Sequence, residues 1–259
     1  MVDGKDLGQA FEKKEPSKEP KDEFIAFSDS LGRISPSLSE GIRLYNKKQW
    51  EKALEEFIAV RIAKLSAEEI AEYHYYLGLC YTKLRRYDEA QLYLEQVTSS
   101  PANTLRFQQC RLLLAFVYIN TSRHRQAELE LRQLQNNGVE SPQLYNAMAY
   151  AAWVQNRHQV SIELYEKTLK IDADNITAMN SIGFILADTG IDILRGLHFC
   201  KKVVEINPQN AAYLDSLGWA YYKSGDSERA RICLSRALEI APDEKEILRH
   251  FKIVTGDET

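Results

Sequence analysis

Histidine and cysteine are the side chains that could bind a metal ion or act as nucleophiles, so their spacing is the first test for chemistry. Metal binding needs two or three ligands on one face, as in His-x-x-x-His or Glu-x-x-His. No two histidines have this spacing, and His198 and Cys200, two residues apart, point away from each other on a helix. The sequence therefore predicts no metal site. The histidines are His74, His124, His158, His198 and His250.

Nucleophilic catalysis and phosphate binding have sequence patterns of their own. A Ser or Cys nucleophile needs a base and an orienting acid, and no strand–turn–helix elbow is expected because no strand is predicted. The glycines are isolated, so no glycine-rich phosphate loop is present. We therefore expect no enzymatic activity and no cofactor. The cysteines, none of them in a Cys-x-x-Cys pair, are expected to be buried free thiols: Cys80, Cys110, Cys200 and Cys233.

The composition favours helix and gives few clues to a charged partner. Of 259 residues, 44% are apolar and 27% charged, with seven prolines and a net charge of -4. No basic stripe is visible, so nucleic acid is not an expected partner, and no apolar run approaches the roughly 18 residues of a membrane span. The polar N-terminus is unlike a signal peptide. The sequence as given predicts a cytoplasmic location, with envelope association as the alternative if a signal segment precedes it.

A helix–turn–helix pattern fills residues 207–242. Leu214, Gly218 and Tyr221 share one helical face, and Gly225 ends that helix. The second helix has its own face of small and apolar residues: Ala230, Leu234 and Ala237.

This pattern resembles the tetratricopeptide repeat (TPR), a unit of 34 residues that must stack on neighbours to bury its apolar face. The resemblance covers Ile34 to Glu244. It implies an all-α fold, a right-handed α-solenoid superhelix of about six TPR helix–turn–helix repeats plus a C-terminal capping helix. The expected repeats are 34–70, 71–107, 108–141, 142–175, 176–210 and 211–244.

Each expected repeat has one small residue in its first helix and one in its second. Aligned across the repeats, these residues form two columns, which set the register because the paired helices approach closely there. Their separation is twelve residues, except for thirteen between Gly183 and Gly196, which places one inserted residue near Ile191. Four residues are expected to begin second helices: Trp50, Tyr87, His124 and His158. The column pairs are Gly41 and Ala53, Gly78 and Ala90, Ala115 and Ala127, Ala149 and Ser161, Gly183 and Gly196, and Gly218 and Ala230.

The two ends of the chain differ from the repeats. Residues 1–23 are a mixed-charge segment with little to bury, so a disordered tail is expected. Residues 24–33 are expected to form a short lead-in segment. Residues 245–259 are expected to form the capping helix and a tail, with Asp243 as the helix N-cap.

In the TPR family the first helices line an inner, concave wall, and this resemblance implies a partner-binding groove. Aromatic side chains there would supply contact area, and Asn side chains would hydrogen-bond a peptide backbone. Packing and binding remain equal alternatives for Tyr150 and Trp219, while Trp153 and Tyr222 are expected to be exposed. Asp215 should favour a donor or a positive group. The expected groove residues are Phe116, Asn146, Tyr150, Trp153, Asn180, Phe184, Asp215, Trp219 and Tyr222.

The segment from Asn180 to Pro242 is similar to a subfamily of bacterial TPR proteins. These have a 35-residue penultimate repeat with LAD-x-G in its turn, followed by AYLDSLGWAYY, and are commonly envelope-associated or lipoprotein scaffolds. The leading hypothesis is a non-enzymatic scaffold that binds a protein or peptide partner in the groove. The alternative is an oligomeric structural or assembly subunit of a bacterial complex, with a homo-oligomer as one form.

Overall fold

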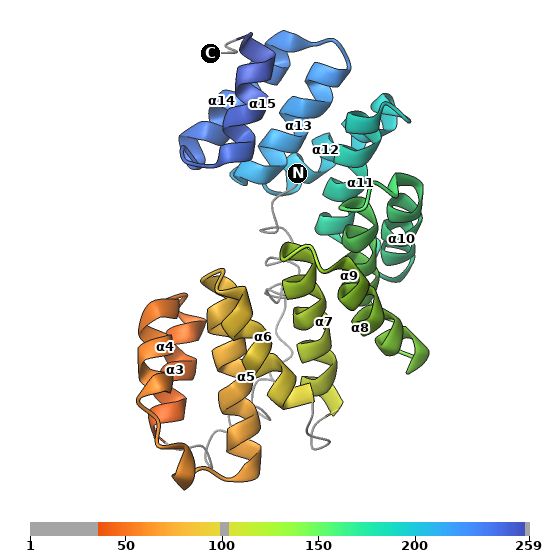
Figure 1. Ribbon diagram of the computed structural model, residues 1–259. Helices are drawn as coiled ribbons and strands as arrows, with labels where there is room; N and C mark the ends of the chain where they lie inside the picture. Colours follow the sequence, from red (N-terminus) through yellow and green to blue (C-terminus); the bar gives the residue numbers. More distant parts are fainter. Residues whose placement is uncertain (1–35, 99–103, 257–259) are drawn as a thin grey trace. The chain divides into compact units, whose positions relative to one another are not determined.

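The computed structural model describes residues 36–98 and 104–256, so the predicted tail and lead-in segment lie outside the described residues. Within the described ranges the chain forms thirteen α-helices and one 3-10 helix, with no strand, which confirms the all-α fold. The chain divides into two compact units (Figure 1). Their described parts are residues 36–139, without 99–103, and residues 140–256.

The first unit consists of three consecutive helix pairs. In each pair the second helix packs against the first, and neighbouring pairs are in contact. The helices are α3 (Pro36–Asn46), α4 (Trp50–Ile58), the 3-10 helix η1 (Ile62–Lys64), α5 (Ala67–Lys83), α6 (Tyr87–Thr98), α7 (Thr104–Asn120) and α8 (His124–Asn136).

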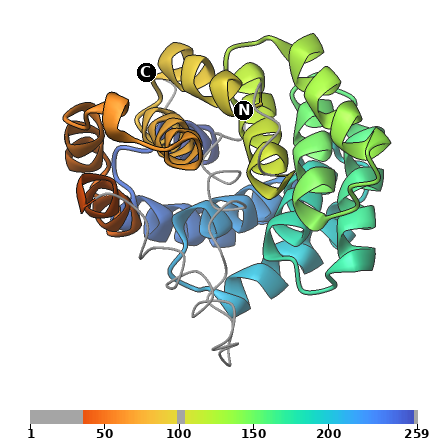
Figure 2. The same cartoon turned by 90° about the horizontal axis from the view of Figure 1, so that it is seen from below.

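The second unit contains three further pairs and one last helix, α15, which packs against α14 and α13. The pairing within each unit can be followed in Figure 2. Second helices begin at Trp50, Tyr87, His124 and His158, as predicted. The residue-level division into six repeats stays a prediction. The helices are α9 (Pro142–Trp153), α10 (His158–Ile171), α11 (Ile176–Thr189), α12 (Ile193–Ile206), α13 (Ala211–Lys223), α14 (Ser227–Ile240) and α15 (Lys245–Thr255).

The first helices of the second unit begin at side-chain caps. Ser141, Asn175 and Asn210 each accept a hydrogen bond from a backbone N–H in the first turn of α9, α11 and α13. The last helix, α15, begins at Lys245 and differs in its cap. Its N-cap is Glu244, without a side-chain hydrogen bond, so the prediction of Asp243 as the cap was wrong. No helix in the described part of the chain is both long and apolar enough to span a bilayer.

The small-residue columns are close helix–helix contacts. A Cβ built on Gly196 would lie 2.7 Å from the carbonyl oxygen of Gly183 and 2.9 Å from the backbone nitrogen of Ala187. A Cβ on Gly218 would lie 2.7 Å from Leu234 Cγ. These distances are shorter than a van der Waals contact. A side chain at Gly196 would push the paired helices apart because it meets backbone atoms, whereas one at Gly218 would first displace the Leu234 side chain.

The turns inside the helix pairs share one backbone conformation. Seven residues after each first-helix small residue, the chain has a positive φ, for example 57° at Arg85, 59° at Ser122 and 88° at Gly225. The next backbone N–H donates to a carbonyl five residues earlier, as from Asp226 to Tyr221 at 2.9 Å. This is the Schellman geometry that closes helix ends.

The inserted residue is located by the same turns. Gly190, with a φ of 73°, also lies seven residues after its column glycine, so the helix α11 before it has normal spacing. The extra residue falls after Gly190 and before Ile193, where α12 begins. The closing hydrogen bond runs instead from Asp192 to Leu186 at 3.4 Å. The insertion is therefore confined to the turn.

Residues with a Cβ are strained in the left-handed region, where glycine is not. Ser122 has this conformation and is exposed, so Ser122→Gly should raise the free energy of unfolding by about 1 kcal/mol. Thermal unfolding followed by circular dichroism would measure it. Ser122→Ala is the matched control, because it keeps the Cβ and should give no gain. An equal gain in both variants would contradict the strain argument.

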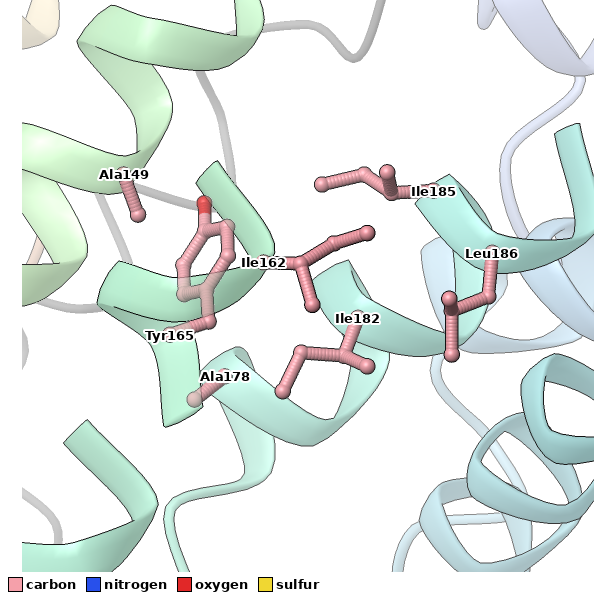
Figure 3. Packing of buried hydrophobic residues seen from close by; sticks show 7 residues of the cluster. All are labelled: Ala149, Ile162, Tyr165, Ala178, Ile182, Ile185 and Leu186. Atoms are coloured by element: carbon pink, nitrogen blue, oxygen red, sulfur yellow. The ribbon is translucent and has the colours of Figure 1, made fainter. Parts of the chain in front are cut away.

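The core of the second unit joins each pair to the next. Tyr165 of α10 lies between Ala149 of α9 and Ala178 of α11, and Ile162 faces Ile182 (Figure 3). All are buried. The four cysteines are also buried free thiols, as predicted, and burial raises the pKa of the Cys80, Cys110 and Cys200 thiols to about 12. The thiols are therefore packing groups rather than nucleophiles.

Candidate functional site

Eight of the nine predicted groove residues lie on the first helices of the second unit. The ninth, Phe116, is buried on α7 and belongs to the first unit. The eight are Asn146, Tyr150 and Trp153 on α9, Asn180 and Phe184 on α11, and Asp215, Trp219 and Tyr222 on α13.

Five aromatic rings from four helices follow one another in close contact, and we call them the ring series: Trp153, Phe184, His250, Trp219 and Tyr222. The ring centroids of Trp153 and Phe184 are 6.0 Å apart in a T-shaped arrangement. His250 lies 6.1 Å from Phe184 and is stacked on Trp219 at 4.2 Å. Trp219 lies 5.2 Å from Tyr222. The series thus runs across α9, α11, α15 and α13.

The interior of the ring series is buried and its two ends are partly exposed. Phe184, Trp219 and His250 are buried, whereas Trp153 and Tyr222 retain intermediate exposure. Trp153 and Tyr222, which were expected to be exposed, are therefore only partly exposed. Tyr150 is also buried, so Tyr150 and Trp219 both serve packing in this structure.

The asparagines beneath the rings are buried side chains rather than open hydrogen-bonding groups. Asn146 is 2% exposed, and its Nδ2 donates to Asn175 Oδ1 at 3.2 Å. Asn175 Oδ1 also accepts from the backbone N–H of Ala178 and so caps α11. Within the described part of the chain, no group hydrogen-bonds to Asn146 Oδ1. Asn180 is equally buried.

Asp215 is paired with a residue of the same chain. The Nδ1–H of His250 donates to Asp215 Oδ1 at 2.8 Å, and the His250 side chain is fully buried. On the other side of the ring, Nε2 lies 3.1 Å from Arg249 Nη2 and 3.5 Å from Glu246 Oε1. A neutral imidazole can donate through Nδ1 and accept from Arg249 through Nε2. Asp215 was expected to favour a donor or a positive group on a partner, and in this structure α15 of the same chain supplies a donor.

Burial dominates the electrostatics of this carboxyl. It raises the pKa of Asp215 above its ordinary value, while the hydrogen bond from His250 opposes the rise. The Asp215 side chain is buried whether the carboxyl is protonated or ionised. Its interaction with His250 therefore decides how well the ionised form is tolerated. The Asp215–His250 pair therefore links α13 and α15 electrostatically as well as by packing.

A second carboxylate, Asp188, binds a buried member of the ring series, Trp219. Trp219 Nε1 donates to Asp188 Oδ1 at 2.9 Å, and Lys223 Nζ lies 3.6 Å from the same oxygen. Lys223 also sits 5.4 Å from the centre of the Trp219 ring. The positive charge of Lys223 is therefore largely offset by Asp188, which leaves this face close to neutral.

Sequence reasoning missed His250 as a member of the site. It had been considered only as a metal ligand, and its partner Asp215 lies on another helix. One signal was available, because a charged Asp215 in a buried column requires a donor and α15 is the next helix along the chain. Within residues 36–98 and 104–256, no group of three His, Cys, Asp or Glu side chains is placed to hold a metal ion.

Comparison with known proteins concerns the repeats and the fold. Residues 71–99 and 211–244 match the model of the tetratricopeptide repeat. The TPR repeat-containing protein PA4667 of Pseudomonas aeruginosa is 34% identical over 80 residues, which are 31% of this chain and 13% of that protein. The human protein O-mannosyl-transferase TMTC3 is 30% identical over 94 residues, 36% of this chain and 10% of that protein. The chain thus spans only a small part of these relatives' lengths.

A likeness among solved structures concerns the fold. The crystal structure of a tetratricopeptide repeat protein from Parabacteroides merdae matches with a TM-score of 0.70 at 13% sequence identity. The match covers 85% of this chain and 83% of that one.

Proposed function

We propose that this chain, a tetratricopeptide repeat protein, is a protein–protein interaction scaffold that holds a partner peptide or helix on the face formed by α9, α11 and α13. The TPR fold itself suggests a scaffold for protein partners. The observation that carries the finer proposal is the ring series, whose ends at Trp153 and Tyr222 are partly exposed. Rigid aromatic side chains that keep one face in solvent are the groups that dominate binding hot spots.

The charges of this face favour a neutral or apolar segment. Lys223 is engaged by Asp188, so it does not offer a free cation for a C-terminal carboxylate. The buried rings behind Trp153 and Tyr222 hold these two side chains in fixed orientations, which lowers the entropy lost on binding. We infer a ligand that places apolar side chains against Trp153 and Tyr222. An enzymatic role is not part of the proposal, and its absence stays a prediction.

Removal of the two exposed rings should weaken binding. Peptides selected from a random phage-displayed library on the immobilised chain provide the probe, and calorimetry gives their dissociation constants. Trp153→Ala and Tyr222→Ala should each weaken binding about tenfold or more, because each deletes a large aromatic contact. Leu194→Ala is the matched control, since Leu194 is an apolar side chain 77% exposed on α12. Unchanged affinity in both ring variants would rule out this face.

A second candidate function, an oligomeric assembly subunit, is supported by a different observation. Three isoleucines, each the last residue of a second helix, are exposed at 50% for Ile171, 49% for Ile206 and 42% for Ile240. Apolar side chains repeated in one position of successive pairs could pack on another copy. Analytical ultracentrifugation over a wide concentration range decides this, because a strict monomer would contradict it.

A further inference from the structure

We infer that Asp215, Trp219 and Phe184 form a helix-docking site that selects an amphipathic helix carrying an imidazole or cationic side chain, and that α15 occupies this site as an internal ligand. The inference rests on the proposed function and identifies the class of partner at one end of the same face. The partner we propose is a helix of another protein with the chemistry of α15, which binds by displacing α15.

The first argument is the position of α15. Its His250 contacts three side chains that sequence analysis had assigned to the partner-binding wall: Asp215 and Trp219 of α13, and Phe184 of α11. The imidazole is stacked 20° from the plane of the indole, and no part of it reaches solvent. The wall is therefore covered at this end by a helix of the chain itself.

The second argument is charge complementarity. Asp215 is a buried carboxyl on α13, and among residues 36–98 and 104–256 its hydrogen bond comes from His250. A helix that replaced α15 without a donor would leave this carboxyl buried and unpaired, which is strongly unfavourable. Histidine, arginine or lysine at the same position would satisfy it. Asp215 therefore acts as the selective group of the site.

The third argument is that α15, the last helix, is held by fewer buried side chains than the helices of the core. It has eleven residues, a length at which an isolated helix is marginal in water, and its N-cap makes no side-chain hydrogen bond. Only Ile247 and His250 among its residues are fully buried, while Phe251 and Val254 pack partly buried against the core. Terminal elements with so few buried side chains open at lower free energy than the core. The free energy needed to open α15 and admit a competing helix is therefore smaller than that needed to open the core.

The experiment uses a full chain that folds intact and is then cut. A specific protease site placed between Pro242 and Asp243 leaves α15 attached during folding and releases it afterwards. The probe is a fluorescent synthetic peptide with the sequence Asp243 to Gly256, and binding is followed by anisotropy. The cut chain should bind this peptide, and a His250→Ala peptide should bind at least about tenfold more weakly. A His250→Arg peptide should retain most of the affinity.

The uncut chain is the key comparison. It should bind the peptide at least about tenfold more weakly than the cut chain, because its own α15 occupies the site. The inference is overturned if the cut repeats stay helical by circular dichroism and bind no peptide. It is overturned equally if peptides with and without His250 bind alike, or if cut and uncut chains bind alike.

If cutting the chain before α15 unfolds the second unit, backbone amide hydrogen exchange in the uncut chain provides the test instead. In the uncut chain, the amides of α15 should exchange faster than those of α13 and α14, because α15 opens locally. Exchange of α15 only together with α13 would show that it cannot be displaced. The phage-selected peptides separate the two proposals: if they depend on Trp153 and Tyr222 while the α15 peptide fails, the scaffold function stands and the docking site does not.

Discussion

Replacement of Gly196 by alanine is expected to lower the free energy of unfolding of the second unit by about 1 to 2 kcal/mol. The added Cβ would lie 2.7 Å from the Gly183 carbonyl oxygen and 2.9 Å from the Ala187 nitrogen. Both are backbone atoms of α11, so the helices must separate, and overpacking of this kind typically costs about 1–3 kcal/mol. This outweighs the higher helix propensity of alanine, which is worth about 1 kcal/mol.

Fluorescence-detected denaturation can assign the loss to the correct unit. The chain has three tryptophans, of which Trp50 lies in the first unit and Trp153 and Trp219 in the second. In a Trp50→Phe background the signal reports the second unit alone. Gly218→Ala is the matched control, because its Cβ meets mainly the Leu234 side chain, which can move. A Gly196→Ala protein as stable as Gly218→Ala would contradict the prediction.

The second large effect is expected from His250→Ala, which should destabilise the same unit by about 2 to 3 kcal/mol at neutral pH. The change removes a fully buried ring and leaves the Asp215 carboxyl buried without its hydrogen-bond donor. Loss of one partner from a buried pair costs about 3–5 kcal/mol when both groups are charged. Solvent entry beside a short terminal helix should reduce this figure. Urea denaturation in the Trp50→Phe background measures it.

Matched variants separate the hydrogen bond from the packing. His250→Asn keeps a donor near the position of Nδ1 and should recover part of the loss. Asp215→Asn removes the carboxyl, so the double variant with His250→Ala should lose less than the two single changes added together. Strict additivity would show that the Asp215–His250 contact contributes only packing.

The loss in His250→Ala should depend on pH. Burial raises the pKa of Asp215 above its ordinary value of 3.8, so the folded state holds this proton more tightly than the unfolded state. Stability from the protonated carboxyl is fully present below pH 3.8 and is lost as the pH rises through the folded pKa. The deficit of His250→Ala should therefore shrink toward acidic pH. Glu246 and Arg249, which face the other side of the ring, are kept constant in this comparison.

The helix pairs were predictable because their signals are local and repeated. Small residues twelve apart mark where two helices touch, and Trp50 or His158 three residues earlier marks where a helix begins. Such patterns depend on neighbouring residues of one pair. Burial of the wall was harder to predict. Tyr150 and Trp219 have the residue type of a binding surface, and only the packing of the next helix decides that solvent does not reach them.

The Asp215–His250 contact shows the limit most clearly. The two residues belong to different helices and are 35 positions apart. The helix α15 follows the last pair, so the repeat pattern does not extend to it. No aligned position therefore predicted which of its side chains would be buried against α13. The expectation of a donor opposite Asp215 was chemically sound, but its source could come only from three-dimensional structure. Phe116 illustrates the same limit, because its column position did not reveal that it lies in the other unit.

The turn after Gly190 shows that the register between paired helices does not depend on the length of their connection. Although one residue has been added there, Gly196 still packs against Gly183 as Ala230 packs against Gly218. The close approach of small residues fixes how α12 is rotated against α11, and the turn merely spans what distance remains. The alignment of the paired helices and the length of the turn between them are therefore free to vary separately. This turn, with Ile191 exposed, can change in length or sequence while the helices it joins keep their alignment.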